Sequence, residues 1–142
     1  MAYKTLFKPK NVKKYIGDSN NIVCRSLWER RVCKFLDENK NILKWSSEEI
    51  VIPYLSPIDQ KIHNYYPDFL VQFNDGSKVK TWLLEVKPSK QLVLKENSSK
   101  KEKITWIVNT AKWEAAKNYS LKNNMEFKIL TEKEIFTNAN AN

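Results

Sequence analysis

The chain has 142 residues, 42% of them hydrophobic and 12% aromatic, and its formal net charge is +9. This length and composition suit a single folded domain with an ordinary hydrophobic core, and they exclude a wholly disordered chain. Apolar runs reach only three residues, as in Trp82-Leu83-Leu84, so we expect neither a membrane span nor a signal peptide.

Charge is distributed unevenly along the chain. Residues 1–47 hold 11 Lys/Arg against 4 Asp/Glu, residues 48–86 hold 3 against 6, and residues 87–142 hold 11 against 6. Basic flanks attract polyanions, most often nucleic acid, whereas clustered carboxylates repel them. A divalent cation held by the acidic centre would remove this contradiction, although scattered carboxylates would give the same composition.

The first third of the chain predicts an arm, a helix and a strand. Residues 1–20 interleave lysines with aromatic residues without a clean period, which predicts an extended basic arm. Apolar residues recur every three or four positions from Asn21 to Asn39, which predicts an amphipathic helix. Such a helix would separate Cys24 from Cys33 too far for a disulfide, so we expect reduced core thiols in an intracellular protein. Residues 48–55 are rich in β-branched side chains and predict a strand.

Two further strands, a long helix and a last strand follow. Residues 65–73 and 79–87 predict strands that are joined by a hairpin. A polar mobile loop comes after Pro88, then a helix over about 101–123, a strand over 125–131 and a capped helical turn. This order, αβββαβ, predicts an α/β fold with a mixed β-sheet flanked by helices. We expect a basic arm over 1–20, one domain over 21–136 and a disordered tail over 137–142.

The hairpin decides whether two central carboxylates meet. If Asp75 and Gly76 form a two-residue turn, Asp68 and Glu85 are diagonal neighbours on one face, roughly 7–8 Å apart at the backbone, and Lys87 shares that face. A three-residue loop would separate the carboxylates unless a bulge restored the parity. Close carboxylates repel each other unless a cation compensates, so the pair predicts a Mg²⁺ site at which Mn²⁺ would substitute. Lys87 could orient an attacking water or neutralise developing charge.

Pro67-Asp68 and Glu85-Val86-Lys87 match the pattern of the PD-(D/E)XK nucleases, and the chain resembles that superfamily. The resemblance implies a restriction-endonuclease-like fold and a Mg²⁺-dependent deoxyribonuclease. It implies Asp68, Glu85 and the carbonyl of Val86 as metal ligands and Lys87 as the catalytic lysine.

Glu29, in the sequence SLWE, resembles the helix glutamate that TnsA-type transposon endonucleases add to the metal and catalytic site. Ser26-x-x-Glu29 also fits a capping box. The expected helix already includes Cys24 and Arg25, so Ser26 would lie inside it and not at its start, which argues against that cap.

Segments along most of the chain resemble the head completion proteins of T-even-like phages. They are FKPKNVKKYIG, SLWE, SEEIVIPY, YYPDF, EVKP, AKWEAAK and MEFKILTEKE. This likeness implies action on DNA ends after packaging, with phage head, portal or neck proteins as partners, and neither a membrane nor a small-molecule cofactor. It implies the host cell cytoplasm during infection as the location, with the virion as a second one.

Charge alone predicts the DNA contacts, because the residues after Pro88 match the family less clearly. A solvated helix face would give the same lysines. The candidate phosphate contacts are Lys13, Lys14, Lys90, Lys100, Lys101, Lys112 and, on the same helix, Lys103 and Lys117. Trp106 and Trp113 fit core packing better than base stacking.

Three other ionisable residues have ordinary explanations. Glu48 and Glu49 could join the site, but a solvated strand end is the better explanation for them. His63, the one histidine of the chain, fits a surface position better than a substrate contact.

Two main hypotheses follow. The first is a metal-dependent nuclease that hydrolyses DNA phosphodiesters, and the second is a structural head-completion factor that binds the DNA end or portal without catalysis. A transposase-type cutter of specific ends would need a sequence-reading partner that the chain does not visibly contain.

Overall fold

The computed structural model describes residues 4–139, with side chains for residues 4–136. Its centre is a four-stranded mixed sheet in the order β3-β6-β7-β8. The strands are β3 (Ile42–Ser47), β6 (Phe69–Asn74), β7 (Val79–Val86) and β8 (Glu126–Leu130). The first three run antiparallel and β8 runs parallel to β7. This architecture confirms the predicted α/β class and is compatible with a restriction-endonuclease-like fold.

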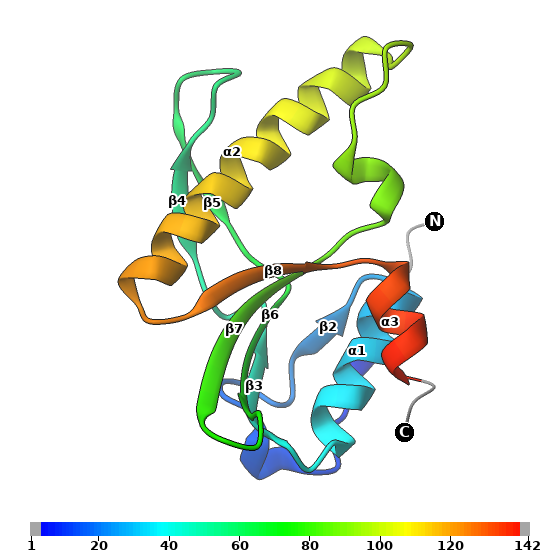
Figure 1. The fold of residues 1–142 in the computed structure, drawn as a ribbon, viewed down its shortest axis with the longest axis vertical. Coiled ribbons are helices and arrows are strands. Elements are labelled where there is room, and N and C mark those ends of the chain that lie inside the picture. Colours follow the sequence, from blue (N-terminus) through cyan, green and yellow to red (C-terminus); the bar gives the residue numbers. More distant parts are fainter. Residues whose placement is uncertain (1–3, 140–142) are drawn as a thin grey trace.

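Helices cover both faces of the sheet (Figure 1). On one face, α1 (Leu27–Glu38) and α3 (Glu132–Ala139) lie beside each other over a core that includes Trp45, Phe69 and Leu84. On the other face, α2 (Lys100–Lys122) and the hairpin β4 (Ile52–Leu55) and β5 (Ile62–Tyr65) pack on a smaller core around Leu83. Neighbouring residues of β7 therefore belong to different cores, because side chains alternate along a strand.

The segment expected as a basic arm packs on the domain instead of standing apart from it. Strand β1 (Thr5–Phe7) pairs with β2 (Ile22–Cys24), and a short 3-10 helix, η1 (Val12–Lys14), lies between them. Phe7 and Tyr15 are buried and contact Trp45 edge to face. Residues 1–3 of the expected arm lie outside the described residues.

The predicted start of the first helix is wrong. Residues 22–24 form β2, and α1 begins only at Leu27, where the Ser26 hydroxyl caps the helix by accepting the Glu29 N–H at 3.1 Å. Cys24 and Cys33 are therefore not on one helix. Both are buried and free, and their Sγ atoms are 3.5 Å apart. The prediction of buried, free thiols is confirmed. The prediction that a shared helix keeps the two cysteines far apart is wrong.

The strand predicted over 48–55 is shorter and belongs to another sheet. Its ordered part, β4, pairs with β5 in a separate two-stranded sheet. The central sheet instead uses β3, which was not predicted. A bulge between Ile42 and Lys44 interrupts the alternation of buried and exposed residues that would have revealed this strand.

The turn between β6 and β7 is longer than expected. Asn74 pairs with Val79, so the loop has four residues, with Gly76 at a φ of 100°. The loop is two residues longer than predicted, which keeps the parity of the register. The paired register ends at Phe69 opposite Leu84, and one further step in the same register places Asp68 opposite Glu85 and not diagonal to it.

The predicted long helix and last strand are confirmed as α2 and β8. A capping box between Ser99 and Glu102 starts α2, and a 3-10 helix, η2 (Ser89–Leu92), lies in the preceding segment that was expected to be a mobile loop. Within residues 4–139, no helix is long and apolar enough to cross a membrane.

The predicted capped turn is the beginning of α3, where Thr131 and Glu134 share hydrogen bonds. This helix continues into the first three residues of the expected tail, to Ala139. Residues 140–142 of that tail lie outside the described residues.

Candidate active site

Carboxylates follow one another across three neighbouring strand ends of the central sheet. Glu48 comes directly after β3, Asp68 directly before β6 and Glu85 near the end of β7. The Glu48 N–H donates to the Asp68 carbonyl at 3.1 Å, which extends the β3–β6 pairing by one residue. Sheet pairing therefore brings together three acidic residues that are far apart in the sequence.

The fourth carboxylate comes from the first turn of α1. Glu29 accepts the backbone N–H of Arg25 at 3.1 Å through Oε1, while its own N–H donates to Ser26. The argument against a cap is thus wrong, because the helix starts after Arg25. The cap and a role in the site do not exclude each other, since the same capping contacts hold Glu29 at the helix end that faces the strand ends.

Oxygen atoms of Glu29, Glu48 and Asp68 lie within 4.8 Å of one another. Such a set of carboxylate oxygens is the ligand type that hard divalent cations prefer. Among the described residues, Glu85 does not belong to a group of this kind. The structure thus brings Glu48 into the cluster, which corrects the interpretation of Glu48 as a solvated strand end.

The protein environment disfavours negative charge at Asp68. Burial raises the pKa of Asp68 well above its usual value, the neighbouring Glu85 raises it further, and the Val86 N–H, which donates to Asp68 Oδ2 at 2.7 Å, lowers it. Burial also raises the pKa of Glu29, with Glu48 adding to the effect. Carboxylates whose charge is poorly compensated by their surroundings are typical of functional sites.

Arg25 partly compensates this negative charge. Its guanidinium donates two hydrogen bonds to Glu48, at 2.8 and 3.1 Å, and these bonds raise the pKa of Arg25. Glu48 has a φ of 56°, a left-handed conformation that is uncommon for a residue with a side chain. The described residues therefore hold one cluster member by a fork of two charge-assisted bonds.

Glu85 is held by two other side chains. The Tyr65 hydroxyl donates to Glu85 Oε1 at 2.7 Å, and Lys87 Nζ lies 3.6 Å from Glu85 Oε2. Glu85 is only 7% exposed. Lys87 and Glu85 are thus side by side, as the alternation along the strand predicts.

The candidate DNA-contacting lysines fall into two groups. Lys90, Lys100 and Lys101 are exposed on η2 and the first turn of α2, and Lys112 lies further along α2 with its Nζ 5.7 Å from the ring centre of Tyr65. The other group is Lys13 and Lys14, on η1.

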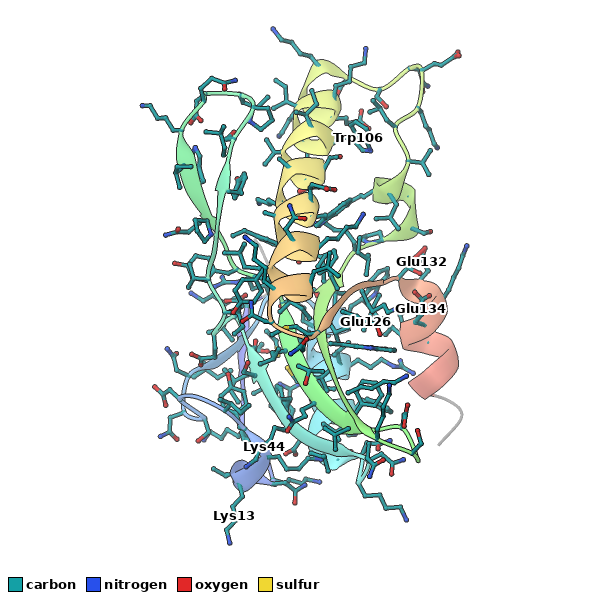
Figure 2. The ribbon with its side chains drawn as sticks, turned by 60° about the vertical axis from the view of Figure 1, so that its left-hand side comes forward. Lys13, Lys44, Trp106, Glu126, Glu132 and Glu134 are labelled. Atoms are coloured by element: carbon teal, nitrogen blue, oxygen red, sulfur yellow. The ribbon has the colours of Figure 1, made fainter. Side chains whose placement is uncertain are left out.

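This second group lies away from the carboxylates. Lys14 Nζ donates to the carbonyls of Asp37 and Asn39 at the C-terminal end of α1, the end opposite Glu29. Lys13 and Trp106 of α2 are at opposite ends of the molecule (Figure 2). The structure therefore gives Lys14 a helix-end role that needs no DNA.

Three further predictions concern single residues. Trp113 packs in the core beneath α2, as expected, and Trp106 is partly buried nearer the start of the helix. His63 is exposed on β5 and its Nε2 lies 2.7 Å from Asp59 Oδ2, which agrees with a surface position. Glu49 accepts a hydrogen bond from the Tyr15 hydroxyl.

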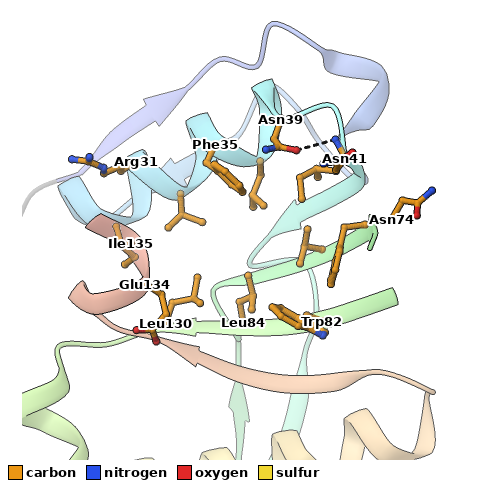
Figure 3. A pocket seen from close by; sticks show the side chains of 15 residues that line it. Arg31, Phe35, Asn39, Asn41, Asn74, Trp82, Leu84, Leu130, Glu134 and Ile135 are labelled. Atoms are coloured by element: carbon orange, nitrogen blue, oxygen red, sulfur yellow. Dashed lines mark hydrogen bonds between the residues drawn. The ribbon is translucent and has the colours of Figure 1, made fainter. Parts of the chain in front are cut away.

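A separate cavity of about 330 Å³ lies on the other side of the sheet. It is enclosed by α1, α3, β6 and β7 and is lined mainly by apolar side chains such as Phe35, Trp82 and Ile135 (Figure 3). None of the four clustered or neighbouring carboxylates described above lines it. The largely apolar lining does not suit a phosphate or a cation.

Comparison with known proteins identifies the family of the chain. Residues 39–132 match the family described as "TnsA-like endonuclease N terminal". The chain belongs to this family. The matched part contains Glu48, Asp68, Glu85 and Lys87, whereas Glu29 precedes it. Over 142 aligned residues, the chain is also 37% identical to the "Head completion nuclease" of Enterobacteria phage T4, covering 93% of each protein. These matches confirm the resemblances to TnsA-type endonucleases and to phage head completion proteins.

Sequence reasoning missed two contributors to the site of this TnsA-like endonuclease family member. Arg25 and Tyr65 act on carboxylates that are 23 and 20 residues away in the chain. No local pattern marks such contacts, because they depend on how separate sheets and helices meet. Glu48 was noticed only as an acidic residue near a predicted strand.

Proposed function

We propose that this protein is a divalent-metal-dependent deoxyribonuclease of the PD-(D/E)XK type, with its active site at the Glu29, Glu48, Asp68 and Glu85 carboxylates. The observation that carries the proposal is the set of three carboxylates with oxygens within 4.8 Å of one another, next to Glu85 and Lys87, in a chain of net charge +9. Membership of an endonuclease family supports it.

The chemistry of the cluster fits a hard cation such as Mg²⁺ or Mn²⁺. Burial and mutual repulsion raise the pKa of Asp68, so the site lacks positive charge that a cation would supply. Glu29, Glu48 and Asp68 would hold the ion, with Glu85 and the Val86 carbonyl as further ligands that the family resemblance implies. When bound, such an ion supplies positive charge to phosphate oxygens and favours deprotonation of water.

The residues around the cluster have distinct tasks. Lys87, beside Glu85, places an ammonium group where it can orient the attacking water or neutralise the negative charge that develops on the phosphate under attack. Arg25 keeps both oxygens of Glu48 in a defined orientation. Pre-organised groups of this kind need little rearrangement when the substrate arrives.

Helix α2 would provide the approach for DNA. Lys100 and Lys101 are 12 and 11 residues before Lys112, which corresponds to about 18 Å along the helix at 1.5 Å per residue. Lysines in the first turn of a helix face the positive end of its dipole, an unfavourable arrangement that a bound phosphate would offset. The basic residues thus extend from the tip of α2 to the site.

The T4 relative is named a head completion nuclease, and we infer the same process for this chain. It would act on DNA ends after packaging, with phage head, portal or neck proteins as partners, in the host cell cytoplasm during infection or in the virion. A scaffold without catalysis remains the alternative and is separated by the experiment below.

The decisive experiment is cleavage of linear, branched and single-stranded DNA by the purified chain with Mg²⁺ or Mn²⁺. We expect metal-dependent cleavage that Asp68→Asn and Lys87→Ala each reduce by more than about 100-fold, since both remove groups at the reacting phosphate. Glu126→Gln, an exposed carboxylate paired with Lys128 on β8, is the matched control and should cleave at the normal rate.

Cleavage that survives both site substitutions would show that another site is responsible. Normal head assembly by phage carrying Asp68→Asn, combined with no Mn²⁺ binding by the normal protein in calorimetry, would favour the scaffold.

A further inference from the structure

Tyr65 connects the β4–β5 hairpin to the candidate active site. It is the last residue of β5, is only 4% exposed, and belongs to the core formed by the hairpin, Leu83 and α2. Its hydroxyl nevertheless reaches a carboxylate of the central sheet, Glu85 on β7, at 2.7 Å. Packing alone poorly explains a buried tyrosine whose hydroxyl donates its hydrogen bond to an acidic residue of the site.

The two oxygens of Glu85 have different partners. Tyr65 donates to Oε1, and Lys87 Nζ lies 3.6 Å from Oε2, a distance too long for a strong hydrogen bond. The hydroxyl therefore fixes the plane of the carboxylate while Oε2 and the lysine stay only loosely paired. Without that bond, Glu85 would be free to rotate toward Lys87 and form a closer ion pair with it.

The surroundings of Tyr65 keep its own position fixed. Lys112 of α2 lies over one face of the ring, 5.7 Å from its centre, and β4 pairs with β5 through Ile52 opposite Tyr65. Burial and the adjacent Glu85 raise the pKa of Tyr65, so the hydroxyl keeps the proton that it donates. A side chain packed in this way in a core is suited to orienting another group.

We propose that Tyr65 is a positioning residue for the reaction: its hydroxyl holds Glu85 in the orientation that serves a bound divalent cation and keeps Lys87 available to the substrate. This inference rests on the proposed nuclease function. It predicts that loss of the hydroxyl weakens both cation binding and turnover while the fold survives.

The test compares Tyr65→Phe with Tyr54→Phe in the full chain. Tyr54 is the matched control because it is also buried, lies on the partner strand β4 and belongs to the same core, but faces His63 instead of Glu85. Calorimetry with Mn²⁺ gives the dissociation constant without reference to activity, and thermal unfolding with EDTA monitors the fold. Cleavage rates measured over a series of Mn²⁺ concentrations then give the half-saturating Mn²⁺ concentration and the maximal rate as separate quantities.

We expect Tyr65→Phe to bind Mn²⁺ about tenfold more weakly, the equivalent of ~1.4 kcal/mol, and to cleave more slowly at saturating Mn²⁺. Tyr54→Phe should match the normal protein in both. In a Glu85→Gln background, Tyr65→Phe should change the dissociation constant less than twofold, because the hydroxyl acts through the Glu85 carboxylate.

Several results would overturn the inference. They are unchanged Mn²⁺ binding by Tyr65→Phe, an equal loss in Tyr54→Phe, a full additional effect in the Glu85→Gln background, or failure of Tyr65→Phe to fold, which would make the hydroxyl structural. Failure of the normal protein to bind Mn²⁺ is a separate outcome, since it overturns the proposed metal-dependent function itself.

Discussion

Two aspartates at opposite ends of β6 have opposite surroundings. Asp68, just before the strand, is partly buried beside Glu85, and its pKa is raised by burial first and by that neighbour second. Asp75, just after the strand, lies in the turn, where N–H groups of Lys78 and Ser77 donate to its carboxylate and lower its pKa. A single strand thus connects a carboxylate whose charge the fold disfavours to one whose charge it favours.

The difference separates a structural carboxylate from a candidate functional one. The charge of Asp75 closes the turn that sets the register of β6 and β7, so it contributes to folding directly. The charge of Asp68 adds nothing comparable, because it lies in a site with Glu29, Glu48 and Glu85 and is satisfied there by one backbone N–H. Groups that are unfavourable for stability and geometrically ordered are commonly retained for function.

The largest expected effect comes from exchanging each charge for a neutral isostere. Asp68→Asn should reduce cleavage by more than about 100-fold and yet raise the free energy of unfolding of the metal-free protein, because it removes a repulsive charge while keeping an acceptor for the Val86 N–H. Asp75→Asn should leave cleavage unchanged and lower stability, because it weakens the bonds to the turn. Denaturant unfolding in EDTA at pH 7.5, together with the cleavage assay, checks both signs.

Stability changes of the same sign for the two substitutions would break the comparison. The same holds if Asp75→Asn lost as much activity as Asp68→Asn, since the turn end of the strand would then also belong to the site.

The next effect is a pH dependence of opposite sign at the two residues. A carboxylate whose pKa is raised in the folded state contributes stability below its unfolded pKa of about 3.9, and this is lost as the pH rises through the folded pKa. A carboxylate whose pKa is lowered, as at Asp75, contributes stability above about pH 3.9 that is lost as the pH falls through the folded pKa. Each contribution is therefore lost in a different pH range.

Thermal unfolding in EDTA from pH 2.5 to 8 measures these contributions. The stability of the normal protein relative to Asp68→Asn should fall as the pH rises toward neutral. Its stability relative to Asp75→Asn should fall as the pH drops into the acid range. Saturating Mn²⁺ should reverse the first trend, because a cation binds the deprotonated carboxylates. If the stability difference between the normal protein and Asp68→Asn did not change with pH, this would contradict the unfavourable environment of Asp68.

The shared position of Asp68 and Glu85 could be predicted from the sequence even though the turn was wrong. The Asp75-Gly76 pair marked the hairpin, and a loop of four residues instead of two shifts the register by an even number, which preserves the faces of both strands. The prediction of which side chains share a face therefore holds despite the wrong loop length, whereas the prediction of which residues pair does not.

The rest of the site depends on contacts that leave no local pattern. Strand β3, and with it the position of Glu48 beside Asp68, was hidden by a bulge that breaks the alternation of side chains. The start of α1 was misplaced because Cys24, four residues before Trp28, continues the helical spacing although it lies in β2. Tyr65 reaches Glu85 only because the separate β4–β5 sheet packs against α2 and the central sheet.

The smallest expected effect tests whether the turn end of β6 has only a structural role. Gly76 has a φ of 100°, and a Cβ added there would meet no atom within 4 Å, so Gly76→Ala introduces backbone strain without a steric clash. We expect a loss of about 1–2 kcal/mol of unfolding free energy. Cleavage and Mn²⁺ binding should be unchanged below the new melting temperature, because the β6–β7 register is also held by six residue pairs and by both cores. Denaturant unfolding and calorimetry on the same preparation measure these quantities. Weaker Mn²⁺ binding in Gly76→Ala would mean that the turn controls the distance between Asp68 and Glu85, and the two ends of the strand would then be mechanically coupled.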